Sequence, residues 1–368
     1  MKLEGLRVVD MSQFLPGPFL SNAMVDHGAD VIKVEPPGGD AGRGVGLSEH
    51  GESVFFRNLN RGKRSVCLDL KDPKQLNDML ELCDSADVFI ESSRPGIAQR
   101  LGVGYDALSA RNPRLIYCSI SAFGQTGPYR DLAAHDLVIQ AVAGAVSCNL
   151  GSDNKPVLPH VPVSDMLSSA LALAGIMMAL YRRHTTGQGD FIDMSMHDAM
   201  LTCFPVLMGA PFVEKRPPDC KNERNLGGAA FYRVYETLDD RHIVLGGQEP
   251  KFIRNLLSAW EREDLIPICE RGPGAHQGVV VEYFETVFKT KTQADWVEWF
   301  KTIDVCFAPV KDLREAFDDP HTHARNMVLI DELGSKHIGS PIKYELEPGK
   351  PSFTIPLLGE HNGEVIDP

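Results

Sequence analysis

The sequence lacks the short motifs that mark metal, redox and dinucleotide sites. Its eight cysteines include no C-x-x-C pair and lie mostly in apolar runs such as SVCLDL and LIYCSIS, where a thiol acts as a small hydrophobic side chain. No H-E-x-x-H motif is present, and the glycines after the first apolar run do not spell G-x-G-x-x-G. We therefore expect no bound metal and no nicotinamide cofactor, and a cytoplasmic location where cysteines stay reduced.

Basic residues and long apolar runs are also scarce. The chain has 37 basic against 50 acidic residues, a net charge of −13, so its surface repels phosphate backbones and we expect no nucleic acid partner. The N-terminal segment MKLEGLRVVD has no apolar stretch of the kind found in signal peptides. The most apolar run, residues 166–181, is too short to span a bilayer comfortably. We expect that run to be a core helix and the protein to have no membrane partner.

Short apolar runs alternating with helical segments indicate an α/β fold. A chain of 368 residues is long for one core, so two domains are expected. Because the strands are separated by helices, they predict an open parallel sheet. The predicted strands occupy residues 6–10, 30–35, 65–70, 87–92, 115–121 and 190–196. A segment rich in proline, glycine and charge then predicts a linker over 205–228, which separates a large domain (1–204 and 325–368) from a small one (229–324).

Two side chains that can move protons lie about thirty positions apart, each before an apolar helix. Asp165 stands where a helix N-cap belongs, and capping alone would explain it. A helix N-terminus also keeps a carboxylate ionised, which suits a base or a nucleophile. His135 could be a partly exposed histidine at a helix start, but an imidazole also titrates close to neutral pH and suits acid–base chemistry.

Further charged residues could complete such a site. Glu249 follows a Gly-Gly turn, although an acidic residue is common in the first turn of a helix. The run RNLNRGKRS, from 57 to 65, holds four cations, and Lys71 follows it. Most charge runs are solvated faces, yet in an acidic protein this cluster could bind an anionic ligand such as a phosphate.

Motifs spread over essentially the whole chain are specific only in combination. They include LEGLRVVD, GADVIKVEPPGGD, NRGKRSVCLDL, ADVFIESSRPGIAQRLGVGYDAL, SAFGQTGPY, AHDLVIQAVAG, SDMLSSALALAG and GEHNGEVI. Together they resemble the family III CoA-transferases, also called the CaiB/BaiF family, which includes the α-methylacyl-CoA racemases.

The resemblance implies a fold, a ligand and partners. A Rossmann-like large α/β domain would bind coenzyme A, carried as an acyl-CoA substrate, and a smaller α+β domain would complete an interlocked homodimer. The positions expected to bind CoA by similarity are Arg61, Lys63, Lys71, Arg94 and Arg100. Pro36-Pro37 stand where many members have an arginine, so one expected CoA contact has no counterpart at that position.

Two reactions are compatible with this resemblance. In the transferases, an aspartate matching Asp165 attacks the thioester and CoA passes to a second carboxylic acid. In the racemases, residues matching His135 and Asp165 exchange the α-proton from opposite faces, and a glutamate matching Glu249 supports them. HDLVIQ departs from the racemase form in its second half, which favours transfer; α-methylacyl-CoA racemisation stays the alternative. A non-catalytic CoA-binding protein is disfavoured because the Asp165 carboxylate is present.

Overall fold

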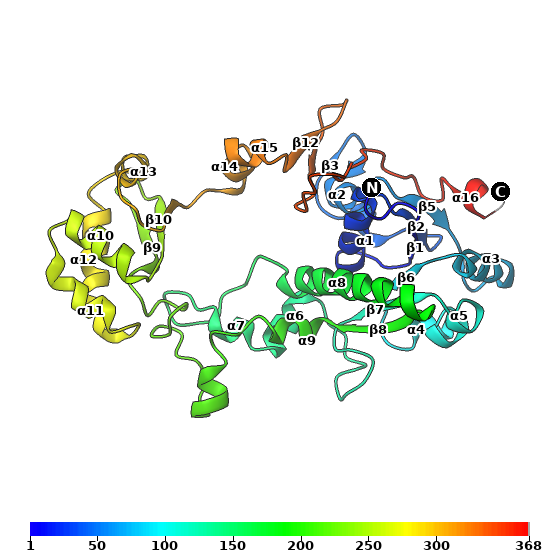
Figure 1. Cartoon of the computed structure of the whole chain (residues 1–368), viewed down its shortest axis with the longest axis horizontal. Helices are drawn as coiled ribbons and strands as arrows, with labels where there is room; N and C mark the ends of the chain where they lie inside the picture. Colours follow the sequence, from blue (N-terminus) through cyan, green and yellow to red (C-terminus); the bar gives the residue numbers. More distant parts are fainter. Residues whose placement is uncertain (367–368) are drawn as a thin grey trace. The chain divides into compact units, whose positions relative to one another are not determined.

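The structure, a computed structural model, describes residues 1–366 and contains a six-stranded parallel sheet (Figure 1). The strand order is β5-β2-β1-β6-β7-β8, and all five pairings are parallel. The strands are β1 (Arg7–Asp10), β2 (Asp30–Glu35), β5 (Arg64–Cys67), β6 (Val88–Glu91), β7 (Ile116–Ser121) and β8 (Asp190–Ser195). The predicted open parallel sheet is confirmed.

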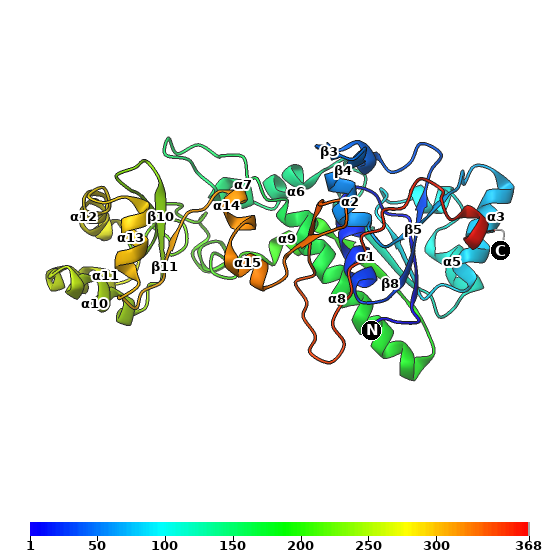
Figure 2. The ribbon, with the colours of Figure 1, turned by 90° about the horizontal axis from the view of Figure 1, so that it is seen from above.

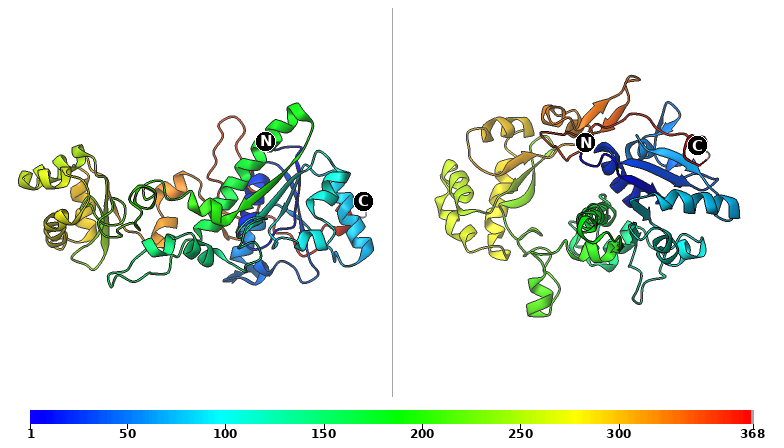
Figure 3. Two further views of the ribbon diagram at one scale, coloured as in Figure 1. Left: turned by 90° about the horizontal axis from the view of Figure 1, so that it is seen from below. Right: turned by 45° about the vertical axis from the view of Figure 1, so that its right-hand side comes forward.

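Helices cover both faces of this sheet, and its inner strands β6 and β7 are buried along their whole length, as in other parallel sheets. Figures 2 and 3 show α1 (Pro16–Asp26) and α8 (Val163–Thr186) on one face, with α3 (Pro73–Asp84) and α5 (Tyr105–Arg111) on the other. Met79 and Leu82 of α3 pack with Val9, Ile32 and Phe89 of the strands. The shorter elements around the sheet are β3 (Ser48–Glu49), β4 (Glu52–Ser53), α2 (Val54–Asn60), α4 (Ile97–Arg100), α6 (Asp136–Val142), α9 (Met196–Leu201), α15 (Pro320–Ala324), β12 (Val328–Ile330), β13 (Lys336–Ile338) and α16 (Asn362–Val365).

Helix α8 is longer than the sequence predicted. It has 24 residues and begins at Val163, so by length and composition alone it could cross a membrane. Ala172, Ile176 and Leu180 recur every four residues and are buried, and the helix contacts α1, β7 and β8. Such a buried stripe is typical of a helix packed on a sheet.

A distant segment covers the open edge of the sheet at β5. The backbone N–H of His361 donates to the Ser65 carbonyl over 2.9 Å, and the Asn362 side chain binds both the N–H and the carbonyl of Cys67, at 2.8 and 3.1 Å. Figure 2 shows α16 beside β5 and α3. Unpaired backbone groups of this edge strand are therefore satisfied by residues almost 300 positions later.

The chain divides into two compact units. Unit 1 holds the parallel sheet and comprises 1–143, 160–203 and the described residues from 320 onward; unit 2 comprises 144–159 and 204–319. Unit 2 has an antiparallel sheet of β9 (Tyr232–Glu236), β10 (His242–Gly246) and β11 (Phe307–Pro309), in the order β11-β10-β9. Its helices are α7 (Ala145–Cys148), α10 (Pro250–Ala259), α11 (Ile266–Glu270), α12 (Gly278–Phe288), α13 (Gln293–Phe300) and α14 (Leu313–Phe317).

An aromatic core holds unit 2 together. Phe284 and Phe288 of α12 are buried against Tyr235 of β9, and the buried Trp296 of α13 packs on Phe288. The ring centroids of these three pairs are between 5.1 and 5.7 Å apart. The antiparallel pair β9–β10 forms a hairpin around Asp239-Asp240. Unit 2 is thus an α+β body with its own hydrophobic core.

Candidate active site

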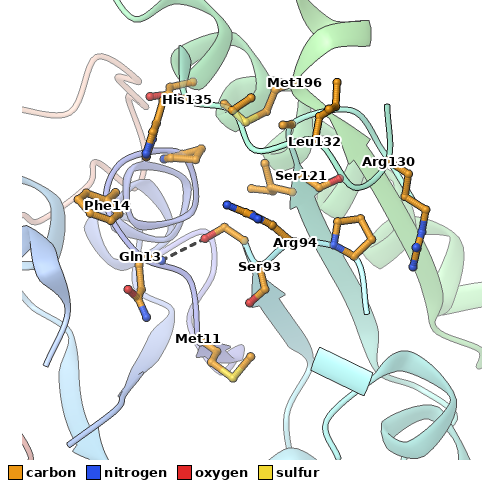
Figure 4. A pocket seen from close by; sticks show the side chains of 17 residues that line it. Met11, Gln13, Phe14, Ser93, Arg94, Ser121, Arg130, Leu132, His135 and Met196 are labelled. Atoms are coloured by element: carbon orange, nitrogen blue, oxygen red, sulfur yellow. Dashed lines mark hydrogen bonds between the residues drawn. The ribbon is translucent and has the colours of Figure 1, made fainter. Parts of the chain in front are cut away.

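A cavity of about 340 Å³ opens where the direction of strand progression reverses, between β1 and β6. Ligands of open α/β sheets bind at this switch point, beyond the carboxyl ends of the strands. Figure 4 shows side chains from these strand ends converging on the cavity. All lining residues belong to unit 1: Met11, Gln13, Phe14, Pro16, Ser92, Ser93, Arg94, Pro95, Ile120, Ser121, Ala122, Arg130, Leu132, Ala134, His135, Asp165 and Met196.

The structure brings Asp165 and His135 to the same cavity. His135 is exposed and occupies the N-cap position of α6, so its ring is carried at the start of a helix as the sequence indicated. Its ring meets the Phe14 ring edge-on, with the centroids 6.2 Å apart. Asp165 is half-buried at the start of α8. Two proton-transferring groups from different helices therefore face one space.

Asp165 is not the N-cap of its helix. The helix begins two residues earlier, at Val163, and its N-cap residue is Pro162, which has no side chain to accept a hydrogen bond. Burial, and secondly the charge of Asp136, raise the pKa of Asp165 to about 7. Asp165 therefore does not cap its helix, and burial opposes the ionisation that a helix N-terminus favours.

Asp136 supplies the cap that Asp165 does not. Its Oδ1 accepts hydrogen bonds from the backbone N–H of Ser164 at 2.9 Å, from the Ser164 hydroxyl at 2.6 Å and from the backbone N–H of Asp165 at 3.3 Å. Its Oδ2 accepts from Gln140 Nε2 at 2.6 Å. One carboxylate of α6 therefore fixes the first turn of α8 and shapes the charge around Asp165.

Phe14 adopts a backbone conformation that bulky residues rarely have. Its φ is +61°, in the left-handed region, and its N–H donates to Asp40 Oδ1 at 3.4 Å. Such a conformation persists only where the surroundings impose it, and it recurs at functional sites. Here it presents an aromatic ring to the cavity beside His135. No sequence pattern indicated this.

Ser121 is a second feature that the sequence did not reveal. It is the last residue of β7, lines the cavity and is only 4% exposed. Within residues 1–366, its Oγ has no hydrogen-bond partner. A buried hydroxyl without a partner is costly, so this one is available to a ligand in the cavity.

Arginines gather on the β6 side of the cavity. Arg94 is exposed and lines it, as does Arg130, whose Nε donates to the Gln125 carbonyl at 3.0 Å. Arg100 and Arg130 both approach Gly96. A Cβ atom at Gly96 would lie 3.3 Å from Arg100 Nη1 and 3.6 Å from Arg130 Nη2. Arg94 and Arg100 were proposed from the sequence, whereas Arg130 was not, although GPYR follows the Gly-rich turn directly.

Two of the predicted CoA-binding cations lie in the interior instead. Arg61 is fully buried and binds both carboxylate oxygens of Asp26, while its Nη2 donates to the Ile338 carbonyl at 2.9 Å. Lys63 Nζ lies 3.1 Å from Asp10 Oδ2 and 2.9 Å from Asn60 Oδ1, with both members of the ion pair buried. Their charged ends are therefore occupied by internal partners.

The Asp10–Lys63 pair belongs to a larger buried network. Burial would raise the pKa of Asp10, but Lys63 and Lys33 outweigh it and lower that pKa to about 2. Burial lowers the pKa of Lys63 to about 8. Lys33 also pairs with Asp40 at 2.7 Å, and both are buried. The network stabilises the strand ends beneath the cavity, which is a structural role.

The remaining predicted positions are exposed. Lys71 follows β5 and Arg100 ends α4, and both side chains face solvent. Glu249 belongs to unit 2, where it is exposed at the N-cap position of α10 without a side-chain capping bond. Within residues 1–366, no group of three or more His, Cys, Asp or Glu side chains could hold a metal ion.

Comparison with known proteins gives concordant matches. A family model described as CoA-transferase family III matches residues 3–362. The chain is 32% identical to human alpha-methylacyl-CoA racemase, covering 100% of this chain and 93% of that protein. It is 34% identical to acetyl-CoA:oxalate CoA-transferase of Acetobacter aceti, over 92% of this chain and 88% of that protein. A crystal structure of a CaiB/BaiF family protein from Brucella suis matches with a TM-score of 0.84 at 29% identity, over 99% and 98% of the two chains. The resemblance found in the sequence is confirmed.

Proposed function

Because the chain belongs to CoA-transferase family III, we propose that it moves CoA from an acyl-CoA to a carboxylic acid through a covalent intermediate on Asp165. The observation that carries this proposal is the half-buried Asp165 carboxylate, which faces a cavity at the switch point of the sheet beside exposed arginines. With a pKa of about 7, this group is about half ionised at neutral pH and largely ionised above it, and the ionised form is a competent nucleophile.

The transfer proceeds by exchanges between an anhydride and a thioester. The Asp165 carboxylate attacks the acyl-CoA carbonyl and expels the CoA thiolate, which leaves an acyl-aspartyl anhydride. The thiolate attacks the aspartyl carbon, releasing the first acid and forming an aspartyl-CoA thioester. The acceptor carboxylate then expels the thiolate from that carbon, and the thiolate finally attacks the acceptor's acyl carbon to form the new acyl-CoA and free Asp165. Ser121 Oγ is a donor available within this cavity.

The CoA phosphates would meet the exposed cations of unit 1. Lys71 follows β5, and Arg94 and Arg100 follow β6. Since β5 and β6 belong to one parallel sheet, all three cations come after carboxyl ends at the same edge. We include Arg130 in this group because it converges with Arg100 near Gly96. Arg61 and Lys63 are left out because internal carboxylates occupy them.

The second candidate is racemisation of an α-methylacyl-CoA, and one observation favours it. His135 and Asp165 line the same cavity, as two bases acting on one α-carbon must. The pKa of Asp165, near 7, suits proton transfer as well as nucleophilic attack, so it does not distinguish the two reactions. The two relatives named above differ by only two percentage points in identity, 34 and 32%, so identity does not discriminate either.

We further propose a homodimer in which unit 2 carries Glu249 toward a partner's cavity. The exposed face of α8 supports this, because Met178 and Tyr181 are 67 and 81% exposed and Leu171 is 36% exposed. A large apolar surface of this kind on a soluble protein is typical of a subunit interface. Light scattering on the purified protein gives its mass, and a monomer would contradict the arrangement.

The deciding experiment separates the two reactions in one vessel. The enzyme is incubated in D2O with acetyl-CoA or a 2-methylacyl-CoA, with and without oxalate as acceptor. Oxalate-dependent formation of a new thioester, with an adduct on Asp165 that hydroxylamine traps, supports transfer. Deuterium incorporation at the α-carbon without any acceptor supports racemisation. If neither appears across a wider set of acyl-CoAs and acids, both proposals fail.

The His135→Ala variant tests the role of the second base. Racemisation needs two proton-transferring groups, so α-proton exchange should fall by about 10²- to 10⁴-fold. Covalent transfer on Asp165 needs no base at His135 and should change much less. Both rates are measured on one preparation by mass spectrometry. If both rates fall equally, His135 does not act in proton exchange alone, and the assigned roles of His135 and Asp165 are wrong.

The Asp136→Asn variant tests how Asp165 is tuned. Asparagine keeps the oxygen that caps α8 but removes the charge that helps to raise the pKa of Asp165. The acidic limb of the pH–rate profile should therefore move to lower pH. The matched control is Asp106→Asn, which removes an exposed carboxylate from α5 on the other face of the sheet and should leave the limb in place. An unshifted limb in Asp136→Asn would show that the charge of Asp136 is screened from Asp165.

A further inference from the structure

Two cysteines 72 positions apart meet in unit 2. Cys148 ends α7, and Cys220 lies in the loop before β9. Both line one cavity of about 570 Å³, which shares no lining residue with the catalytic cavity. The Cys220 thiol donates to the carbonyl of Ser147 at 3.4 Å, and the Ser147 hydroxyl lies 3.8 Å from Cys148 Sγ. The two side chains therefore share one local cluster.

Burial, and secondly the neighbouring Cys148, raise the pKa of the Cys220 thiol. Neither thiol is fully buried, so a small reagent can reach both. By contrast Cys83 is buried, and burial raises the pKa of its thiol to about 12. Proximity and access together distinguish the pair from a packed cysteine.

We propose that Cys148 and Cys220 form a reversible dithiol switch, oxidised by a small disulfide of the glutathione type. One thiol loses its proton and attacks the reagent, which releases one glutathione thiolate and leaves a mixed disulfide. The second thiolate attacks the protein sulfur of that mixed disulfide and releases the second glutathione. Two electrons pass from the protein to the reagent, and one sulfur–sulfur bond is exchanged for another.

The bond would close a ring that contains the catalytic aspartate. The chain from 148 to 220 leaves unit 2 at 160, runs through α8, β8 and α9 of unit 1, and returns at 204. A disulfide would therefore join the two segments of unit 2 between which α8, β8 and α9 are inserted in the sequence. Closing a ring of this length restrains the unfolded chain strongly, so the oxidised protein should unfold at a temperature several degrees higher.

The test uses the full-length protein and oxidised glutathione. After incubation, remaining thiols are alkylated and the digest is mapped by mass spectrometry. A Cys148–Cys220 peptide pair that disappears on reduction is expected. As long as the pH stays below the pKa of the attacking thiol, its rate of formation should rise up to about tenfold for each unit by which the pH is raised. The thermal midpoint should rise only in the oxidised sample.

Three variants make the result decisive. Cys148→Ser and Cys220→Ser should each abolish the cross-link and the thermal shift. Cys306→Ser removes an exposed cysteine elsewhere in unit 2 and should keep both. Glutathione adducts on Cys203 and Cys306 without any Cys148–Cys220 pair would overturn the proposal, as would a cross-link between two chains.

Discussion

Replacing Asp165 by asparagine should lower kcat by about a thousandfold or more while the protein stays folded. Asparagine has nearly the same size, and the Asp136 carboxylate that caps α8 is untouched. An amide can neither attack a thioester nor accept an α-proton, so transfer and racemisation both stop. The rate is measured with saturating acyl-CoA, and circular dichroism reports the fold. A fully active variant would remove Asp165 from either mechanism.

The same variant has a stability signature that depends on pH. The pKa of Asp165 is about 7 in the folded chain and near 3.8 in an unfolded one, so between these values the folded state holds a proton that the unfolded state has lost. This group's contribution to stability is therefore present at low pH and is lost as the pH rises toward 7. Relative to the wild type, Asp165→Asn should gain stability across that window, by at most about 4 kcal/mol.

Urea unfolding at several pH values measures this gain. The matched control is Asp153→Asn, which replaces an exposed loop carboxylate and should show no trend with pH. A constant difference between Asp165→Asn and the wild type would mean that the carboxyl group is well solvated.

Replacing Lys63 by methionine should cost about 3–5 kcal/mol of folding free energy. Methionine fills similar space but carries no charge, so Asp10 is left buried without its closest cation. Lys33 is the other cation acting on Asp10, but it is already paired with Asp40. The free energy of unfolding of an ordinary domain is only about 5–15 kcal/mol, so this loss should lower the urea concentration at the midpoint of unfolding.

Lys71→Met is the informative control, because Lys71 was proposed on the same grounds but is exposed. It should unfold like the wild type and raise KM for the acyl-CoA. If instead Lys63→Met keeps its stability and only raises KM, then Lys63 reaches the ligand and its pairing with Asp10 is dispensable.

The inner strands of unit 1 could be predicted because they are buried runs rich in apolar residues, whereas the edge strand β8 is only partly buried and carries Asp190 and Asp193. All six predicted strands are present, and β6 and β7 are buried along their whole length. The start of α8 was misplaced because Pro162 gives no capping signal and the real cap, Asp136, comes from another helix. Local pattern is sufficient for a strand, but not for a cap supplied from 28 positions away.

The residues of the candidate site were also only partly predictable from local sequence. Asp165, His135 and Arg94 line one cavity, and each was picked out from its chemical type and its place in a motif. Arg61 and Lys63 look alike in sequence, yet their partners Asp26 and Asp10 lie 35 and 53 positions earlier. Whether a cation faces a ligand or a buried carboxylate depends on tertiary pairing, which a local run of charge does not reveal. Ser121 was missed for the related reason that an unpartnered hydroxyl is recognisable only when its surroundings are known.

The covering of strand β5 by residues near 361 also has a consequence for how the protein is made. Ser65 and His361 are 296 positions apart, so at about 5–20 residues per second a ribosome needs roughly 15 to 60 s to deliver the second after the first. Throughout that interval the nascent sheet presents an unpaired edge strand, which is the kind of surface that recruits chaperones or pairs with another chain. Yield of soluble protein should therefore depend on translation speed and on chaperone supply more than the stability of the finished fold would indicate.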